Sequence, residues 1–230
     1  TVDEDSFLNI PSARLLANDV DGDILLISQV INPVGGTVSL SSNGDVTFTP
    51  DPDFNGEASF TYVANTPAGG RAEGQVFITV LPVNDDPTAN NDGGFNTLED
   101  QAFTILASEL LANDSDVDGD DLSVVSVTGD GNILVALNEF GEIVVTPTAF
   151  FFGDASFTYE ISDGNGGTST ATASVVVDPV NNLPEPADDA FTTDEDVALL
   201  VTAAELLAND VERDGDLLTW IAIYDNDTRV

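Results

Sequence analysis

Hydrophobic and polar residues alternate in short runs along the first part of the chain. Alternating runs cover residues 37–40, 46–49, 58–63 and 76–80, an apolar run rich in β-branched residues covers 24–31, and Gly, Asn, Asp and Pro separate them. A period of two between turn-forming residues is typical of β-strands with one buried face. Phe60 and Tyr62 share one face of their run, so we expect them in a core.

The same plan returns about 97 residues later. Phe157 and Tyr159 repeat Phe60 and Tyr62, and further runs cover residues 122–127, 134–137, 143–146 and 169–177. About seven short strands in about 95 residues predict an all-β fold, a tandem array of immunoglobulin-like β-sandwiches. Residues 12–16, 108–111 and 203–207 each predict one short helical turn, and Trp220 is predicted in a core strand.

Linkers that carry a proline at each end divide the repeats. They run from Pro82 to Pro87 and from Pro179 to Pro184, and proline restricts the backbone, so we expect stiff joints. The predicted repeats are 1–86, 87–183 and 184–230. The third has too few residues for a core like its neighbours', so we expect it to be truncated or to be completed by another chain.

Charge excludes several classes of partner. The 230 residues hold 42 acidic residues and 4 arginines, with no Lys and no His, for a net charge of −38. Such a surface repels nucleic acids and anionic membranes, and no apolar run is long enough for a membrane span. With 42% hydrophobic residues the chain can still bury a core, which argues against disorder. Cys is absent, and this alone does not fix the compartment.

An acidic motif occurs three times. Each copy has a Glu-Asp pair, then Leu-Leu-Ala-Asn-Asp, then Asp-Gly-Asp, and the copies are 95 and 96 residues apart at the Asp that ends the second element. Alternate carboxylates around a glycine resemble the first half of an EF-hand loop, and crowded carboxylates favour a bound cation. Counting from Asp114, the twelfth position is Val125 rather than the bidentate Glu of an EF-hand. Other residues must therefore complete the site.

The upstream Glu-Asp pair and the linker Asn and Asp residues are the expected additional ligands, which would place the ion at the joint between repeats. Calcium suits a flexible set of many oxygens, magnesium keeps more of its waters, and zinc would need His or Cys. The alternative is ordinary solvated Asp-Gly turns, and three copies favour calcium. The candidate ligands are Glu4, Asp5, Asp19, Asp21, Asp23, Asn84, Asp85, Glu99, Asp100, Asp114, Asp116, Asp118, Asp120, Asn181, Glu195, Asp196, Asp210, Asp214 and Asp216.

The copies are unequal. The first loop is two residues shorter than the second, and the third contains Arg213, which would weaken its site or point away. Asn182 stands where the first linker has Asp85. Residues 163–165 could also bind an ion, although a hairpin turn is the favoured interpretation, and residues 53–56 are expected to form a turn with a core Phe. Three adjacent phenylalanines, at positions 150–152, cannot all face one core, so we expect one to be exposed at a unit interface or partner site, or the three to pack across two layers.

Together these residues resemble the bacterial cadherin-like tandem repeats of large secreted adhesins, including those of the repeats-in-toxin type. The matching features are the Glu-Asp opening, the acidic loop, the Phe-Thr-Tyr strand and the Pro-Val-Asn-Asp close, and they cover nearly the whole chain. The resemblance implies cadherin-like β-sandwiches, extracellular calcium, ions at the joints and roles in adhesion or biofilm.

The leading hypothesis is therefore a calcium-binding repeat that stiffens a cell-surface or secreted adhesin or biofilm matrix protein. A second hypothesis is an extracellular filament or sheath subunit assembled by strand complementation between copies. A third is a carbohydrate-binding module that contacts glycans, although only three Tyr and one Trp occur. We do not expect an enzyme, because no His or Cys is present and the paired carboxylates recur without a visible cleft.

Overall fold

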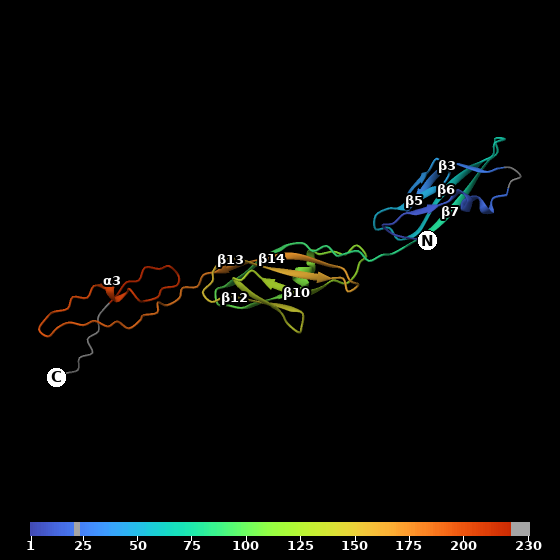
Figure 1. The fold of residues 1–230 in the computed structure, drawn as a ribbon. Helices are drawn as coiled ribbons and strands as arrows, with labels where there is room; N and C mark the ends of the chain where they lie inside the picture. The colour runs from blue at the N-terminus through green and yellow to red at the C-terminus, as the bar shows by residue number, and fades with distance from the viewer. Residues whose placement is uncertain (21–23, 222–230) are drawn as a thin grey trace. The chain divides into compact units, whose positions relative to one another are not determined.

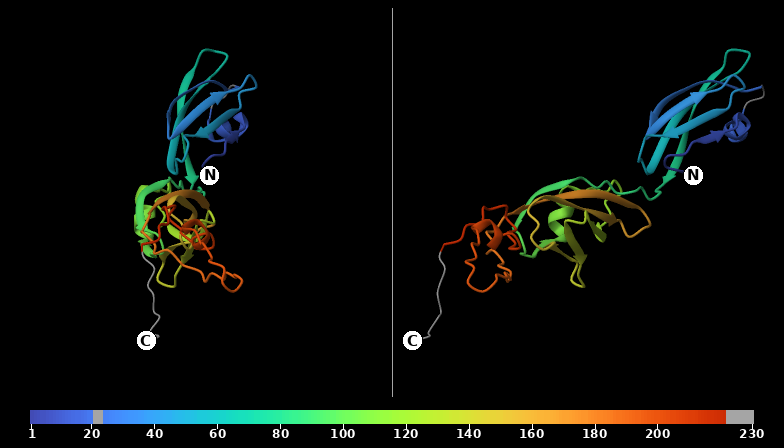
Figure 2. Two further views of the ribbon diagram at one scale, coloured as in Figure 1. Left: turned by 90° about the vertical axis from the view of Figure 1, so that its left-hand side faces the viewer. Right: turned by 60° about the vertical axis from the view of Figure 1, so that its left-hand side comes forward.

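The computed structural model describes residues 1–20 and 24–221, and these residues fall into two compact units. Unit 1 comprises residues 1–86 together with the short segments 116–120 and 165–167. Unit 2 comprises residues 87–115, 121–164 and the chain from Thr168 onward. Each unit contains two facing β-sheets, so the predicted tandem β-sandwich fold is confirmed (Figures 1 and 2).

Unit 1 has a four-stranded sheet in the order β1-β7-β6-β3 and a three-stranded sheet in the order β2-β5-β4. In the first sheet β1 pairs parallel with β7, and the other pairs are antiparallel. The strands are β1 (Val2–Asp3), β2 (Leu8–Ile10), β3 (Leu26–Val34), β4 (Gly36–Leu40), β5 (Val46–Pro50), β6 (Gly56–Asn65) and β7 (Arg71–Leu81).

The core of unit 1 lies between its two sheets. Phe60 and Tyr62 on β6 face inward as the period of two predicts, and the rings of Phe48 and Phe60 stack 6.4 Å apart. The β3–β4 turn is tight because Gly35 has φ +73° and a Cβ there would meet the Phe54 ring at 2.5 Å.

Unit 2 repeats this plan with sheets in the orders β10-β13-β14-β8 and β11-β12-β9. Here the parallel strand β8 is longer than β1 and runs along β14 from Asp92 to Leu98. The strands are β8 (Asp92–Leu98), β9 (Phe103–Leu106), β10 (Ser123–Gly129), β11 (Ile133–Leu137), β12 (Glu142–Pro147), β13 (Gly153–Ser162) and β14 (Thr168–Asp178).

The core of unit 2 has the same pattern. Phe157 and Tyr159 on β13 are buried, and alternate residues of β14 from Ala171 to Val177 join them. Of the three adjacent phenylalanines, Phe151 packs against this core, while Phe150 and Phe152 are 38% and 43% exposed. The expectation that the three cannot share one core is confirmed.

Each predicted helical turn forms. The turns are α1 (Ser12–Leu15) with η1 (Leu16–Asn18), α2 (Ala107–Leu110) with η2 (Leu111–Asn113), and α3 (Ala203–Leu206). In each of the first two turns, one leucine packs into the core of the sandwich: Leu15 is 8% exposed and Leu110 is fully buried. The helices α1, α2 and α3 are each only four residues long, and no helix in the described part of the chain could cross a membrane.

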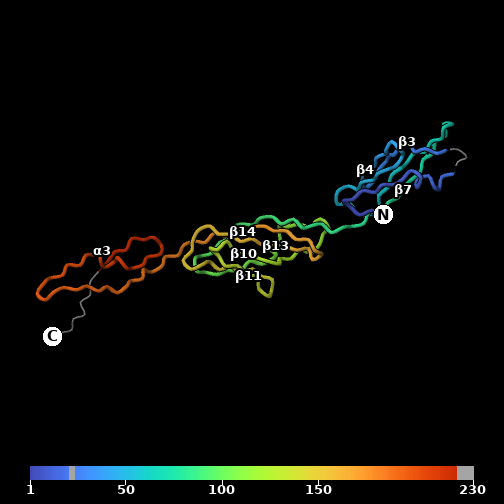
Figure 3. Tube along the Cα trace, in the orientation of Figure 1, coloured from blue at the N-terminus to red at the C-terminus, as the bar shows by residue number. Residues whose placement is uncertain are grey.

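Residues 184–221 form no strand in the structure (Figure 1), and α3 is the element labelled along their trace in Figure 3. The prediction that Trp220 lies in a core strand is wrong, because its side chain is 53% exposed. A period-two pattern buries a residue only when a second sheet covers it, and this segment has none.

Candidate metal centre

Glu4 anchors a group of carboxylates in unit 1, here called the first acidic site (Glu4, Asp5, Asp53, Asp85, Asp116, Asp118 and Asp120). Glu4 follows β1, and its N–H donates to the Leu81 carbonyl at 3.0 Å. Its carboxylate accepts from the Val83 N–H at 2.6 Å, and the residue is only 2% exposed. Strand pairing therefore fixes a buried carboxylate beside the end of β7.

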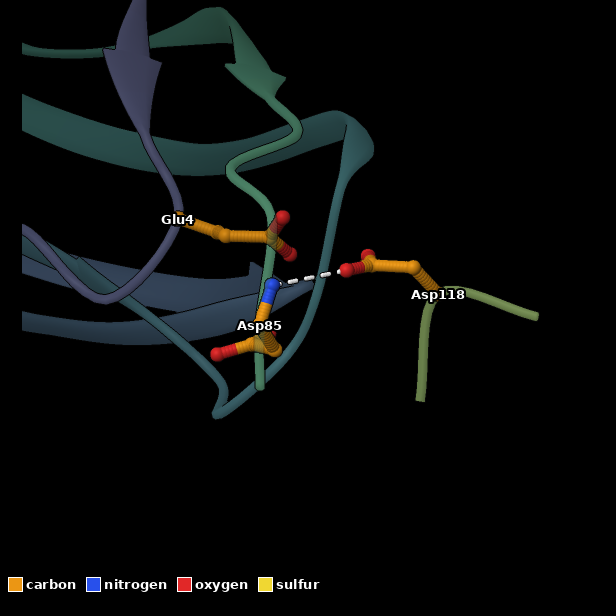
Figure 4. Close-up of side chains that lie close together, drawn as sticks. All are labelled: Glu4, Asp85 and Asp118. Atoms are coloured by element: carbon orange, nitrogen blue, oxygen red, sulfur yellow. Dashed lines mark hydrogen bonds between the residues drawn. The ribbon is translucent and has the colours of Figure 1, made fainter. Parts of the chain in front are cut away.

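Asp85 and Asp118 complete the first trio of this site (Figure 4). One carboxylate oxygen from each of Glu4, Asp85 and Asp118 lies within 4.8 Å of the others. The backbone N–H of Asp85 donates to Asp118 Oδ2 at 2.8 Å. This hydrogen bond holds together two residues that are 33 positions apart in the sequence.

Asp5, Asp53 and Asp85 form a second trio by the same measure. Asp5 and Asp53 adopt φ 57° and φ 56°, in the left-handed region that Asp tolerates better than most residues. Asp53 was expected to be only part of a turn. Sequence reasoning missed it because its counterpart one repeat later is Phe150, so no repeating acidic residue marked the position.

The loop 116–120 supplies the third trio, Asp116, Asp118 and Asp120. Asp116 Oδ1 accepts from the N–H groups of Asp118 and Asp120 at 2.9 and 3.2 Å, and Gly119 turns the chain with φ +81°. Asp120 also accepts from the Asn165 amide at 2.6 Å. The turn that contains Asn165 was considered as an ion-binding turn, but the hairpin interpretation was favoured, because its Gly-rich sequence carried no acidic repeat.

This crowding is electrostatically costly without a cation. Partial burial raises the pKa of Asp85, and the neighbouring charges of Asp5, Asp53, Asp118 and Glu4 add to the rise. Asp85 Oδ2 and Asp116 Oδ2 are buried without a hydrogen-bond partner in the described structure. Buried carboxylate oxygens are normally paired with donors or cations, so the group fits a hard metal ion with oxygen ligands.

A second acidic site in unit 2 is defined by Glu99, Asp100, Asn182, Glu212, Asp214 and Asp216. Glu99 is 4% exposed and its N–H donates to the Asp178 carbonyl at 2.9 Å, as Glu4 does to Leu81. Its Oε1 accepts from the Asn182 amide, while its Oε2 is buried without a partner. The Asn182 N–H donates to Asp214 Oδ2 at 2.5 Å.

Glu212 organises the loop of the second acidic site. Its carboxylate accepts from the N–H groups of Asp214 and Asp216 at 3.1 and 2.6 Å, the role that Asp116 has in the first acidic site. Glu212 was not among the predicted ligands. Its position, 96 residues after Asp116, is the signal that could have identified it.

Asp19 and Asp114, which open the first and second acidic loops, are not part of the two acidic sites defined above. The Tyr62 hydroxyl donates to both carboxylate oxygens of Asp19 at 2.8 and 2.9 Å, and burial and this aspartate raise the pKa of Tyr62 to about 12. Asp114 accepts from the Asn90 N–H at 2.7 Å and contacts the Tyr159 hydroxyl. Burial raises the pKa of Asp114.

The remaining predicted ligands have varied surroundings. Asp100 Oδ1 accepts from the Phe150 N–H at 3.0 Å, and Asp210 accepts from the Ala187 N–H at 2.9 Å. The amides of Asn84 and Asn181 each donate to the carbonyl of the next residue, at 3.2 and 3.3 Å. Glu195 and Asp196 are exposed, unlike Glu4 and Glu99, and Asp21 and Asp23 lie outside the described residues.

Comparisons with known proteins agree with this architecture. Residues 83–178 match the model of a cadherin-like domain, and residues 1–79 match that of a bacterial Ig domain. No curated protein matches the chain.

The chain also matches solved structures at low identity and low TM-score. The human mucin-like protocadherin EC1-2 is 17% identical over 70% of this chain and 86% of its own, with a TM-score of 0.38. An endo-fucoidan hydrolase of glycoside hydrolase family 107 is 23% identical over 70% of this chain, with a TM-score of 0.30. The chain spans about a quarter of the length of that hydrolase.

These domain matches confirm the resemblance that the sequence motifs predicted. Residues 83–178 and 1–79 are of domain types found in adhesion-type extracellular repeats, and the carboxylate groups of unit 1 could hold a metal ion. The chain therefore carries, in tandem, a segment that matches a bacterial Ig domain and a segment that matches a cadherin-like domain.

Proposed function

We propose that the chain is a calcium-binding extracellular repeat that stiffens a cell-surface or secreted adhesin. The observation that carries this proposal is the trio of Glu4, Asp85 and Asp118, whose carboxylate oxygens lie within 4.8 Å of one another. Like charges at such distances repel strongly unless a cation lies between them. Calcium accepts six to eight oxygen ligands in a flexible geometry, and the first acidic site offers seven carboxylates.

An ion in this site would tie together three parts of the sequence. Glu4 follows the first strand, Asp85 lies in the linker between the prolines at 82 and 87, and Asp118 lies in the acidic loop of the second repeat. Cross-linking them would limit the motion of the linker, which is the property that a spacer in an adhesin needs. The proposed repeats, 1–86, 87–183 and 184–230, each carry one Glu-Asp pair for such a site.

The chemistry of the site supports a binding role rather than catalysis. The carboxylates recur by repeat, and the chain has no His or Cys to act as base or nucleophile. Calcium at extracellular, millimolar levels would fill even weak sites of this type. We therefore place the protein outside the cell or on the bacterial surface, as is usual for cadherin-like and bacterial Ig domains.

Thermal melting of the whole chain with calcium, magnesium or EDTA tests this proposal. An ion at a hundred times its Kd stabilises the folded state by about 2.7 kcal/mol, so we expect calcium to raise Tm by on the order of 10 °C. Trypsin cleaves after the few arginines, so an unspecific protease such as proteinase K should be used in parallel to measure protection.

The Asp85→Asn and Asp118→Asn double variant should lose most of the calcium-dependent shift. Glu139→Gln is the matched control, because it removes the charge of an exposed carboxylate between β11 and β12. Equal melting and equal proteolysis of the wild type in calcium and in EDTA would overturn the proposed function.

A further inference from the structure

The two acidic sites are built on the same backbone scaffold. The N–H of Asp85 donates to Asp118, and the N–H of Asn182 donates to Asp214. Asp53 and Phe150, which are 97 residues apart, both have positive φ, 56° and 60°. Differences between the sites therefore come from side chains at equivalent positions.

Three such positions change the charge. Asp53 is replaced by Phe150, Asp85 by Asn182, and Val117 by Arg213. The first acidic site has seven carboxylates. The second has five, Glu99, Asp100, Glu212, Asp214 and Asp216, and its loop adds one positive charge. In the described part of the chain, three carboxylates gather within 4.8 Å only at the first site.

Arg213 is held in place rather than left in solvent. Its guanidinium carbon lies 4.1 Å from the centre of the Phe150 ring, and its Nη2 is 3.0 Å from the Glu185 carboxylate. A cation over an aromatic face is attracted by the ring quadrupole. Two of the replacements thus form one unit: Phe150, in place of a carboxylate, holds the arginine that follows Glu212.

The second site nevertheless has a buried carboxylate oxygen that a cation would pair with. Glu99 is only 4% exposed, and its Oε2 has no hydrogen-bond partner in the described structure. Its Oε1 contacts the Asn182 amide, which also donates to Asp214, so the carboxylate lies within the site. A buried carboxylate oxygen without a hydrogen-bond donor destabilises the folded state unless a metal ion binds it.

We propose that the second acidic site binds fewer calcium ions than the first, and more weakly, because Arg213 on Phe150 supplies a fixed positive charge in place of part of the metal. This proposal rests on the calcium binding proposed above. The chain then has two calcium thresholds: the second site empties first as calcium falls, while the first site stays filled.

Calorimetric titration of the whole chain with calcium, with native mass spectrometry for stoichiometry, tests the proposal. The wild type should show a tight and a weaker class of sites. The triple variant Phe150→Asp, Asn182→Asp and Arg213→Val gives the second site the residues of the first at the three positions that change the charge. It should bind at least one more ion per chain and tighten the weak class by about tenfold, since each change removes repulsion of the metal or adds a ligand.

Three further variants keep the test decisive. Arg213→Val alone is the milder change and should tighten the weak class in the same direction. Arg71→Val is the control, because it removes another arginine, paired with Glu73 and outside both acidic sites. The reciprocal variant, Asp53→Phe with Asp85→Asn and Val117→Arg, should reduce the number of ions bound in the tight class.

The outcomes separate this inference from the function on which it rests. Equal affinity and stoichiometry in the wild type, the triple variant and Arg213→Val would overturn the inference and leave calcium binding intact. The absence of calcium binding in every variant, including the wild type, would overturn both.

Discussion

The second and third copies of the acidic motif share their local structure. Each has a one-turn helix, α2 or α3, and each has one isolated β-bridge, Thr88–Ser115 or Glu185–Val211. In each, a backbone N–H donates to the aspartate that opens the loop: Asn90 to Asp114 at 2.7 Å, and Ala187 to Asp210 at 2.9 Å. These features need only residues within about thirty positions of one another.

The copies differ in what covers them. Leu110, the last residue of α2, is fully buried between two sheets, whereas the equivalent Leu206 is only partly buried and Leu217 is 89% exposed. The comparison shows that the acidic loop and helical turn form from local hydrogen bonds, whereas burial of the leucine requires strands from far along the chain. Turn chemistry alone stabilises a loop, and a core requires both sheets.

The largest difference between the copies should appear on truncating these leucines. Leu110→Ala leaves a cavity in the unit 2 core and should lower the free energy of unfolding by about 2–5 kcal/mol. Leu206→Ala removes little buried area and should cost less than about 1 kcal/mol. Urea unfolding followed by far-UV circular dichroism measures both, and equal losses would refute the distinction.

A smaller effect is expected at Tyr159, which ties the acidic motif of the second copy to its sandwich. Its hydroxyl donates to Asp92 at 2.7 Å and contacts the Asn90 carbonyl at 2.8 Å. Burial, with help from Asp92 and Asp114, raises the pKa of Tyr159. Tyr159→Phe should cost about 1.5–3 kcal/mol, because a hydrogen bond to a charged partner is lost.

Hydrogen exchange adds the readout specific to this comparison. The Asn90 amide should exchange faster in Tyr159→Phe, approaching the rate of Ala187 in the third copy. Tyr62→Phe makes the same atomic change in unit 1 and should leave Asn90 unaffected. An Asn90 rate unchanged by Tyr159→Phe would show that the tyrosine does not hold the motif.

The smallest effect is expected at the cap of α3. The Thr202 hydroxyl accepts from the Glu205 N–H at 3.3 Å, and the Glu205 carboxylate accepts from the Thr202 N–H at 2.8 Å. The N–H and the hydroxyl of Thr202 both donate to the Glu205 carboxylate, and these two hydrogen bonds lower the pKa of Glu205. Thr202→Ala should destabilise this turn by about 0.5–2 kcal/mol without moving the melting temperature of unit 2.

Backbone chemical shifts of residues 203–206 would report that change. Ser108→Ala is the matched control, because Ser108 lies inside α2, whose cap position is Leu106. A drop in the melting temperature of unit 2 on Thr202→Ala would mean that the third copy supports the second sandwich.

Much of the fold was predictable from short-range patterns. The period of two placed Phe60, Tyr62, Phe157 and Tyr159 on inward faces, and each helical turn forms where its leucines predicted it. Such patterns work because side-chain direction in a strand depends only on position, and because turn residues set the local backbone. The same pattern failed at Trp220, where no second sheet is present to complete the layer.

The sequence alone determined the repeat, the strands, the acidic loops and the hard-oxygen chemistry, since these depend on residue type and spacing. Only the tertiary structure decided which carboxylates meet. In that structure Asp114 contacts the Tyr159 hydroxyl, Asp53 and Asp85 lie close to Asp5, and the Arg213 guanidinium packs over the Phe150 ring. The physical reason is distance: contacts between residues tens of positions apart are fixed by how sheets and loops fold back on one another, and neither spacing nor composition encodes that geometry directly.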